Sequence, residues 1–322
     1  PESQTRLRGC QTMSEERKMN TEFRRTMRKI FRNPSAVLGF ALLIFFVIVA
    51  IFAPLIAEPI NPMMLDDNGN PMKLDDPYVM PIITWSSAPV PPSADHPFGM
   101  IQGRDIFYGV VWGTRTAFFI GLTVTIISTL FGIIIGSISG YYGGWIDEVL
   151  MRITDIFMSI PFLLAAMVLT TILGNGIDKV MIAMTVFGWM GAARLIRANI
   201  LQVKEEQYIL ASKALGVKDY FIIMRHVLPN TIFPVLIQAS MRMGSLVITA
   251  AGLSFLGLGA PLGYADWGSM LNFTRNWILG ASGSTFSYWY AVFYPGMAMV
   301  LFVLAWNLVG DALRDVFDPR LK

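Results

Sequence analysis

Residues 204–230 are the part of this sequence most able to do chemistry, because they form a polar segment between two long apolar runs, KEEQYILASKALGVKDYFIIMRHVLPN. Apolar residues recur at helical spacing over 208–215, and Gly216 can adopt the left-handed conformation that ends a helix. A second helical pattern covers 219–226, and we expect Pro229 to stop it. The segment is therefore predicted to form a helix, a turn and a second helix.

The chemistry open to this segment is the binding of another protein. Its first helix carries small residues that would let a partner surface approach closely, and an unpartnered connecting loop would be shorter and more polar. A plain surface loop is the alternative to docking, and docking is the interpretation that we favour. The residues expected to take part are Glu205, Glu206, Tyr208, Ala211, Ser212, Ala214, Leu215, Gly216 and Lys218.

Signatures of catalysis are absent from the sequence. It contains no G-x-x-x-x-G-K-[ST] phosphate loop, no H-E-x-x-H, no G-x-S-x-G and no pair of cysteines. Cys10 is its single cysteine, and His96 and His226 are too far apart to suggest a metal cluster. We therefore expect no enzyme activity, metal or cofactor on this chain, and any ATP that drives it binds to another chain.

Arg242 is a second candidate, because it lies inside an apolar run. It follows Phe233 by nine residues, or about 13.5 Å of helix, which places it near mid-membrane, where an unpartnered charge costs about 3 kcal/mol or more. One interpretation puts Arg242, with Gln238 and Met241, on a translocation path, where it meets a carboxylate of the transported molecule or gates the path. The other makes it structural, paired with a carboxylate or a helix end on a second subunit.

The composition indicates that these residues belong to a membrane protein. The chain of 322 residues is 54% hydrophobic and only 15% charged, and its mean hydropathy is +0.54, so the bilayer is its expected solvent. Apolar runs long enough to cross a membrane predict an all-α protein with six spans, the third kinked by Pro161 and the fourth short. The expected spans are residues 36–57, 115–141, 149–173, 180–196, 233–256 and 288–309.

The positions of Lys and Arg predict the orientation. The segment before residue 36, the 194–228 region and the tail together hold eighteen of them, whereas the loops on the other side hold four. By the positive-inside rule both termini and residues 204–230 are expected in the cytoplasm of a bacterial-type cell membrane. The predicted division is residues 1–35 (basic segment), 36–57 (first span), 58–114 (external), 115–310 (core, with the cytoplasmic region 200–230) and 311–322 (tail).

Residues 58–114 and the basic segment before residue 36 have further expected features. Ten of the eighteen prolines lie between Pro54 and Pro97, which excludes a helix there and favours a small, extended, turn-rich subdomain. Its end, 106–112, is expected in the membrane interface, as are Trp267 and Trp277. The basic segment before residue 36 is either an amphipathic helix on anionic lipid or only a determinant of topology.

Glycines four residues apart mark one face of the second span. Gly132, Gly136 and Gly140 would form a smooth groove along which another helix packs closely, and Gly144 continues the spacing. On the third span, Arg152 and Asp155 are three residues apart and able to pair on one face.

The cytoplasmic segment resembles a known family. Leu210-Ala211-Ser212, then Gly216, then His226-x-Leu228-Pro229 is similar to the E-A-A-x-x-x-G-x(9)-I-x-L-P signature of ATP-binding-cassette importer permeases. It departs from the signature at 210, 212 and 226, and the glutamate missing at 210 has possible substitutes in Glu205 and Glu206. Further agreement comes from His96-Pro97-Phe98-Gly99 with Gly103-Arg104-Asp105, from the run Leu253 to Gly259, and from Gly310-Asp311 through Arg320.

The resemblance implies the C-type permease of the dipeptide, oligopeptide and nickel branch, with the type I importer permease fold. Such a chain pairs with a homologous B-type permease, two cytoplasmic ATPases that bind ATP and Mg, and an extracytoplasmic peptide-binding protein that the loop after the first span approaches. Residues 206–215 would be the coupling helix, which lies in a groove of the ATPase. The expected function is therefore oligopeptide import, with dipeptide or nickel import as the alternative and no nucleic-acid partner.

Two other classes of protein explain the sequence less well. A secondary transporter or channel working alone needs an internal ion site, for which Asp155 and Arg242 are the few candidates, and no inverted repeat is evident. An intramembrane or membrane-anchored enzyme needs a nucleophile and a base, and the sequence offers no such pair.

Overall fold

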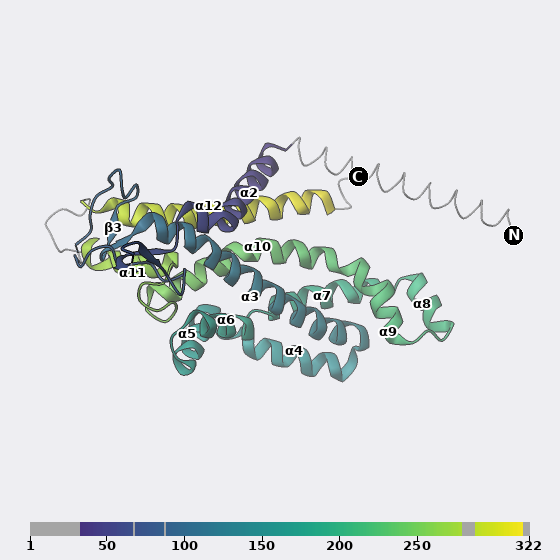
Figure 1. The fold of residues 1–322 in the computed structure, drawn as a ribbon. Coiled ribbons are helices and arrows are strands. Elements are labelled where there is room, and N and C mark those ends of the chain that lie inside the picture. Colours follow the sequence, from purple (N-terminus) through teal and green to yellow (C-terminus); the bar gives the residue numbers. More distant parts are fainter. Residues whose placement is uncertain (1–32, 67, 87, 279–286, 318–322) are drawn as a thin grey trace.

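The computed structural model describes residues 33–66, 68–86, 88–278 and 287–317, so the basic segment before residue 33 lies outside it. It shows an elongated bundle of helices with short strands at one end (Figure 1). Five helices are long and apolar enough to cross a membrane, or six if one bent pair counts as a single span. The predicted class, an all-α membrane protein, is confirmed. The elements are α2 (Pro34–Ile56), β1 (Ile60–Leu65), β2 (Pro71–Lys73), β3 (Met100–Ile101), β4 (Arg104–Asp105), α3 (Ile106–Tyr142), α4 (Gly144–Met158), α5 (Phe162–Leu173), α6 (Ile177–Val186), α7 (Met190–Val203), α8 (Gln207–Ala214), α9 (Asp219–Ile222), the π-helix η1 (Ile223–Val227), α10 (Leu228–Phe255), α11 (Trp267–Ile278) and α12 (Trp289–Phe317).

Helix α3 begins earlier than the sequence predicts. The stretch expected in the interface is its first two turns, because the Asp105 carboxylate caps the helix by accepting from Phe107 N at 2.6 Å. Trp112 is buried and donates to the carbonyl of Ala57 at 2.9 Å. The segment between α2 and α3 therefore ends at β4, and α3 starts inside the packed core.

Two predicted spans are broken helices. The third consists of α4 and α5, which bend by 83° at a break ending in Pro161, so the proline does more than kink it. The fourth, predicted to be short, is a span of 27 residues formed by α6 and α7. Gly188 lies at its break, between the two helices.

The three predicted glycines of α3 lie against α7. A side chain on Gly132 would meet the Trp189 carbonyl oxygen at 2.6 Å, and one on Gly140 the Arg197 carbonyl oxygen at 3.1 Å. Gly136 contacts the backbone of Ala193 in the same way. Gly144 does not continue this face, since it begins α4 with a φ of +56° and open space around it.

Helices α9, η1 and α10 run into one another, so the expected stop at Pro229 is wrong. Proline is accepted in the first turn of α10. In the turn before it, the Asn230 side chain donates to His226 O at 2.6 Å and the Thr231 hydroxyl to Val227 O at 2.9 Å. These two side-chain bonds reinforce the turn that contains the proline, and the chain stays helical through it.

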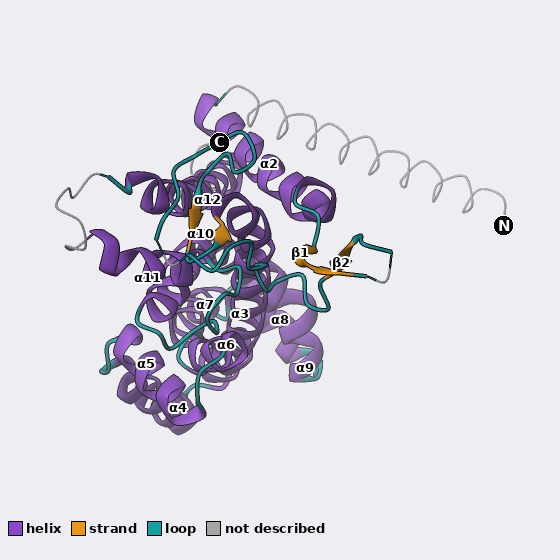
Figure 2. Cartoon of the chain, turned by 60° about the vertical axis from the view of Figure 1, so that its left-hand side comes forward, coloured by secondary structure: helices purple, strands orange, loops and turns teal. Residues whose placement is uncertain are grey.

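The segment between α2 and α3 is turn-rich, as expected, and packs on the end of the bundle. Strands β1 and β2 form one antiparallel hairpin and β3 and β4 another (Figure 2). Tyr78 stacks on Tyr264 with ring centroids 5.6 Å apart. Helix α11 was not predicted, and Trp267, expected in the interface, is instead buried and donates to Val110 O at 3.2 Å.

The predicted tail is mostly helical. Helix α12 continues to Phe317 beside α2 (Figure 1), where Asn33 donates to Asp315 at 3.3 Å. Residues 318–322 lie outside the described residues.

Candidate functional site

The predicted docking residues lie at the end of the bundle opposite the strands. In Figure 1, α8 and α9 project there beyond the ends of α3, α7 and α10. Tyr208, Leu210 and Leu215 expose 43%, 49% and 83% of their surface, which is unusual for large apolar side chains outside a membrane helix. Of the nine predicted residues, Ser212 is half-buried and the other eight are exposed: Glu205, Glu206, Tyr208, Ala211, Ala214, Leu215, Gly216 and Lys218.

The end of α8 explains the glycine of the motif. Gly216 has a φ of +75°, where residues with a Cβ are strained. Its N–H donates to Lys213 O at 2.9 Å, and that of Val217 donates to Ser212 O at 3.2 Å. These two bonds are those of a Schellman cap, so Gly216 terminates α8 and sets the direction of the turn toward α9.

Buried apolar residues and one tyrosine hold α8 and α9 on the bundle. Ile209 of α8 is fully buried in a cluster with Ile200. Tyr141, at the end of α3, donates its hydroxyl to Asp219 at 2.7 Å. The Lys213 ammonium lies 4.7 Å from the centre of the same ring, within cation–π range. Tyr141 therefore contacts both short helices.

Sequence reasoning missed part of this surface. Tyr220 and Phe221 of α9 and Met224 of η1 expose 66%, 55% and 50% of their surface, in addition to the exposed apolar residues at α8. The available signal was the presence of three large apolar residues in a segment otherwise rich in charge.

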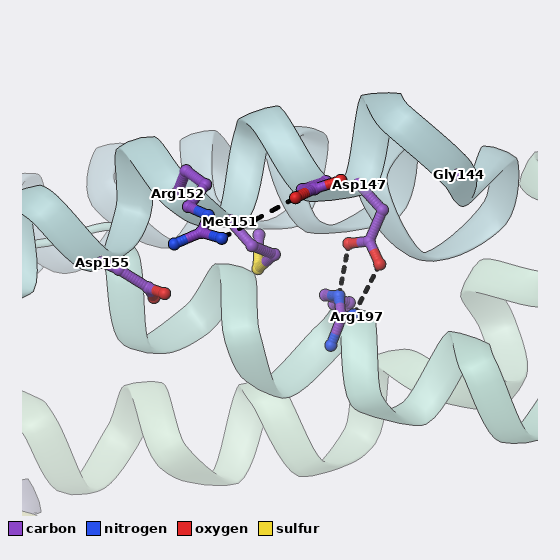
Figure 3. A pocket seen from close by; sticks show the side chains of 7 residues that line it. Gly144, Asp147, Met151, Arg152, Asp155 and Arg197 are labelled. Carbon is purple, nitrogen blue, oxygen red and sulfur yellow. Dashed lines mark hydrogen bonds and ion pairs between the residues drawn. The ribbon is translucent and has the colours of Figure 1, made fainter.

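Ion pairs join α4 to α7 (Figure 3). Arg197 donates to both oxygens of Asp147 at 2.5 Å each, and Arg194 pairs with Asp155. Arg152 lies 3.8 Å from Glu148 and does not make the expected pair with Asp155. Two carboxylates of α4 thus bind two arginines of α7, an arrangement that the sequence did not reveal because the partners are far apart in the chain.

A shallow hollow of about 290 Å³ lies between these charges, lined by Gly144, Asp147, Glu148, Met151, Arg152, Asp155 and Arg197. Both of its arginines already have carboxylate partners. The ion pair of Arg197 with Asp147 therefore holds α4 against α7, and the hollow offers no free charge to a ligand. No group of three His, Cys, Asp or Glu residues that could hold a metal ion occurs in the described part of the chain.

The predicted pathway residues separate into two places. Arg242 donates to the carbonyl of Gly188 at 2.5 Å, and Gln238 is near it, since both side-chain ends lie 4.0 Å from where a Cβ of Gly191 would be. Met241 instead packs against Gly310 of α12. Arg242 thus contacts the backbone between α6 and α7 of its own chain.

Comparison with known proteins matches most of the chain. Residues 132–322 match the family described as binding-protein-dependent transport system inner membrane component. Residues 21–77 match the N-terminal transmembrane domain of oligopeptide transport permease C.

Three relatives are similar over much of their length. The dipeptide transport system permease protein DppC of Bacillus subtilis (strain 168) is 33% identical over 92% of this chain and 85% of its own. The oligopeptide transport system permease protein OppC of the same organism is 34% identical over 92% and 89%. The glutathione transport system permease protein GsiD of Pectobacterium atrosepticum is 39% identical over 72% and 75%.

Proposed function

Because the chain belongs to the family of binding-protein-dependent transport system inner membrane components, the permeases of ATP-binding-cassette importers, we propose that it is half of the translocation pathway of an ATP-driven oligopeptide importer. The relatives named above carry the words dipeptide, oligopeptide and glutathione, so a peptide is the substrate class that they share. Oligopeptides are favoured by the match to the oligopeptide permease N-terminal domain.

The observation that carries this proposal is the exposed apolar surface of α8 and α9. Two large apolar side chains of α8, that of Leu215 directly after it, and three of α9 and η1 are exposed at the end of the bundle. A group of exposed large apolar side chains outside the spanning helices favours a protein partner. In the proposed complex α8 is the coupling helix and lies in a groove of a cytoplasmic ATPase, which binds the ATP and Mg that this chain does not.

The route from α8 into the membrane follows covalent and hydrogen-bonded connections. From Asp219 to Phe255 the chain is helical without interruption, so α9 and α10 can move as one body. Tyr141 connects both short helices to α3, and α3 packs on α7 through its glycines. Movement of α8 by the ATPase would therefore reach α3, α7 and α10 together.

The remaining parts of the complex follow from the family and from charge. A homologous B-type permease would complete the path as a heterodimer, and an extracytoplasmic peptide-binding protein would deliver substrate at the end that carries the strands. The distribution of Lys and Arg favours an orientation with both termini on the cytoplasmic side of the cell membrane, and lipid would surround the outward faces of the spans.

A matched pair of substitutions tests the docking surface. Leu215, which directly follows α8, and Leu262, which lies between α10 and α11, are each 83% exposed. With Leu215→Asp, we expect an ATPase to be lost when the complex is purified through this chain, whereas Leu262→Asp should leave it bound. Equal ATPase recovery with both variants would refute docking at α8.

A further inference from the structure

One face of α10 is polar although the helix crosses the membrane. Gln238, Arg242, Ser245 and Thr249 follow one another at intervals of four, three and four residues, which places them along a single stripe. None of the four is buried. The hydroxyls of Ser245 and Thr249 donate to carbonyls one turn back in the helix, each at 2.9 Å. A polar stripe open to the outside of this chain is unsuited to lipid and typical of a water-filled cavity.

Two polar side chains of this stripe meet beside Gly191 of α7. A Cβ placed on Gly191 would lie 4.0 Å from Arg242 Nη1 and 4.0 Å from Gln238 Nε2, with nothing closer. Because Gly191 has no side chain, the space between its backbone and the two nitrogen atoms is open. Helix α7 begins at Met190, and no side chain caps its first turn, so unpaired N–H groups and the positive end of the helix dipole add to the same place.

Arg242 has donors to spare. A guanidinium group carries five N–H bonds, and the bond from Arg242 to Gly188 uses one of them. Among the residues that the structure describes, no carboxylate lies within ion-pair distance of Arg242, whereas Arg194 and Arg197 of α7 each have one. A charge at this depth faces a water-filled cavity or a partner, and the Gly188 carbonyl accepts from only one of its N–H groups.

We propose that Arg242, Gln238 and Gly191 form a binding site for the carboxylate of a peptide in transit; this inference rests on the proposed function as a peptide importer. Every linear peptide with a free C-terminus carries this group, whatever its sequence. A guanidinium binds a carboxylate through charge-assisted bonds, often two at once, and the Gln238 amide can supply a neutral bond. A carboxylate of the second permease would also neutralise Arg242, and the control variants below distinguish the two partners.

The test compares a labelled tripeptide that has a free C-terminal carboxylate with the same tripeptide as its C-terminal amide. Uptake of each is measured in vesicles that contain the complete complex, either wild type or with Arg242→Gln. The binding protein is the same in both, so its own preference cancels in the comparison. We expect the ratio of acid to amide uptake to fall about tenfold in the variant, the factor associated with losing one hydrogen bond to a charged group.

Control variants make each outcome decisive. Arg152→Gln removes a surface arginine that pairs with Glu148 and should leave the ratio of acid to amide uptake unchanged. Arg242→Lys keeps the positive charge and should retain part of the preference for the acid. An unchanged ratio in Arg242→Gln would overturn the carboxylate site. If Arg242→Gln complexes lose the second permease, the Gln238→Ala variant, which keeps the charge, is tested instead. A wild-type ratio in Gln238→Ala complexes would then overturn the carboxylate site. Failure of the wild-type complex to import either peptide would contradict the proposed function instead.

Discussion

Replacing Gly132 by valine should destabilise the contact between α3 and α7. A first Cβ at this position would already lie 2.6 Å from Trp189 O and 2.7 Å from Ala192 Cβ, about 1 Å inside ordinary contact distance. The oxygen belongs to the backbone of α7 and cannot rotate aside. Either the two helices separate or the backbone shifts, and overpacking of this kind costs about 1–3 kcal/mol.

Gly252→Val is the matched control for this change. Gly252 lies inside α10, and a Cβ there would meet nothing within 4 Å. Both substitutions exchange glycine for the same residue within a helix, so their propensity terms are similar and small, roughly half a kcal/mol in favour of valine. The difference in stability between the two variants therefore reports the helix contact.

The assay is thermal unfolding of the purified chain in detergent. A net loss of about 2 kcal/mol should lower the midpoint of Gly132→Val by about 5 °C, and Gly252→Val should stay within about 1 °C of wild type. Equal shifts in both variants, or none in Gly132→Val, would refute close packing at the glycine face.

Three other perturbations address the docking segment and the external end. Gly216→Val forces a side chain into a conformation with a φ of +75°, at a cost of about 1–2 kcal/mol, and should reduce the ATPase recovered with the complex. Tyr141→Phe removes the 2.7 Å bond to Asp219 but keeps the ring beside Lys213, so peptide uptake per ATP hydrolysed should fall while the ATPase stays bound; an unchanged ratio would exclude a coupling role. Burial raises the pKa of Asp266, so its contribution to stability is present below its unfolded pKa of about 3.9 and is lost as the pH rises through the higher folded pKa. Asp266→Asn should therefore gain midpoint temperature relative to wild type as the pH rises from 4 toward neutrality, and a difference independent of pH would contradict a raised pKa.

Features determined by nearby residues could be predicted from the sequence. The apolar runs gave the membrane spans because length and hydropathy are local properties, and Pro161 indicated the break between α4 and α5. Gly216 was assigned its conformation correctly for the same reason, since a helix that ends in a polar turn commonly needs a residue able to take positive φ.

Features that depend on contacts between distant segments could not be predicted. Tryptophan is a residue type common at membrane interfaces, but the indole of Trp267 donates to Val110 O, which is far away in the sequence. The ion pairs of Asp147 with Arg197 and of Asp155 with Arg194 likewise join residues that are far apart in the sequence. Propensity alone does not reveal either arrangement.

Arg242 combines a feature that follows from the local sequence with one that depends on contacts between distant segments. Its distance from the start of the apolar run gave its depth, and the cost of a buried charge indicated that it must have a partner. The identity of that partner, the carbonyl of Gly188 in the break between α6 and α7, depends on how α10 packs on α7. The sequence analysis also grouped Met241 with Arg242. Met241 instead faces α12, because adjacent residues on a helix point to different sides.

ATP-dependent uptake by reconstituted vesicles tests the central proposal most directly. Vesicles that contain this chain, the second permease, the ATPases and the binding protein should accumulate a labelled oligopeptide only when ATP is supplied to the side that carries α8. Vesicles that contain this chain alone should accumulate none. Uptake by this chain alone and without ATP would contradict the account and favour a transporter that works by itself.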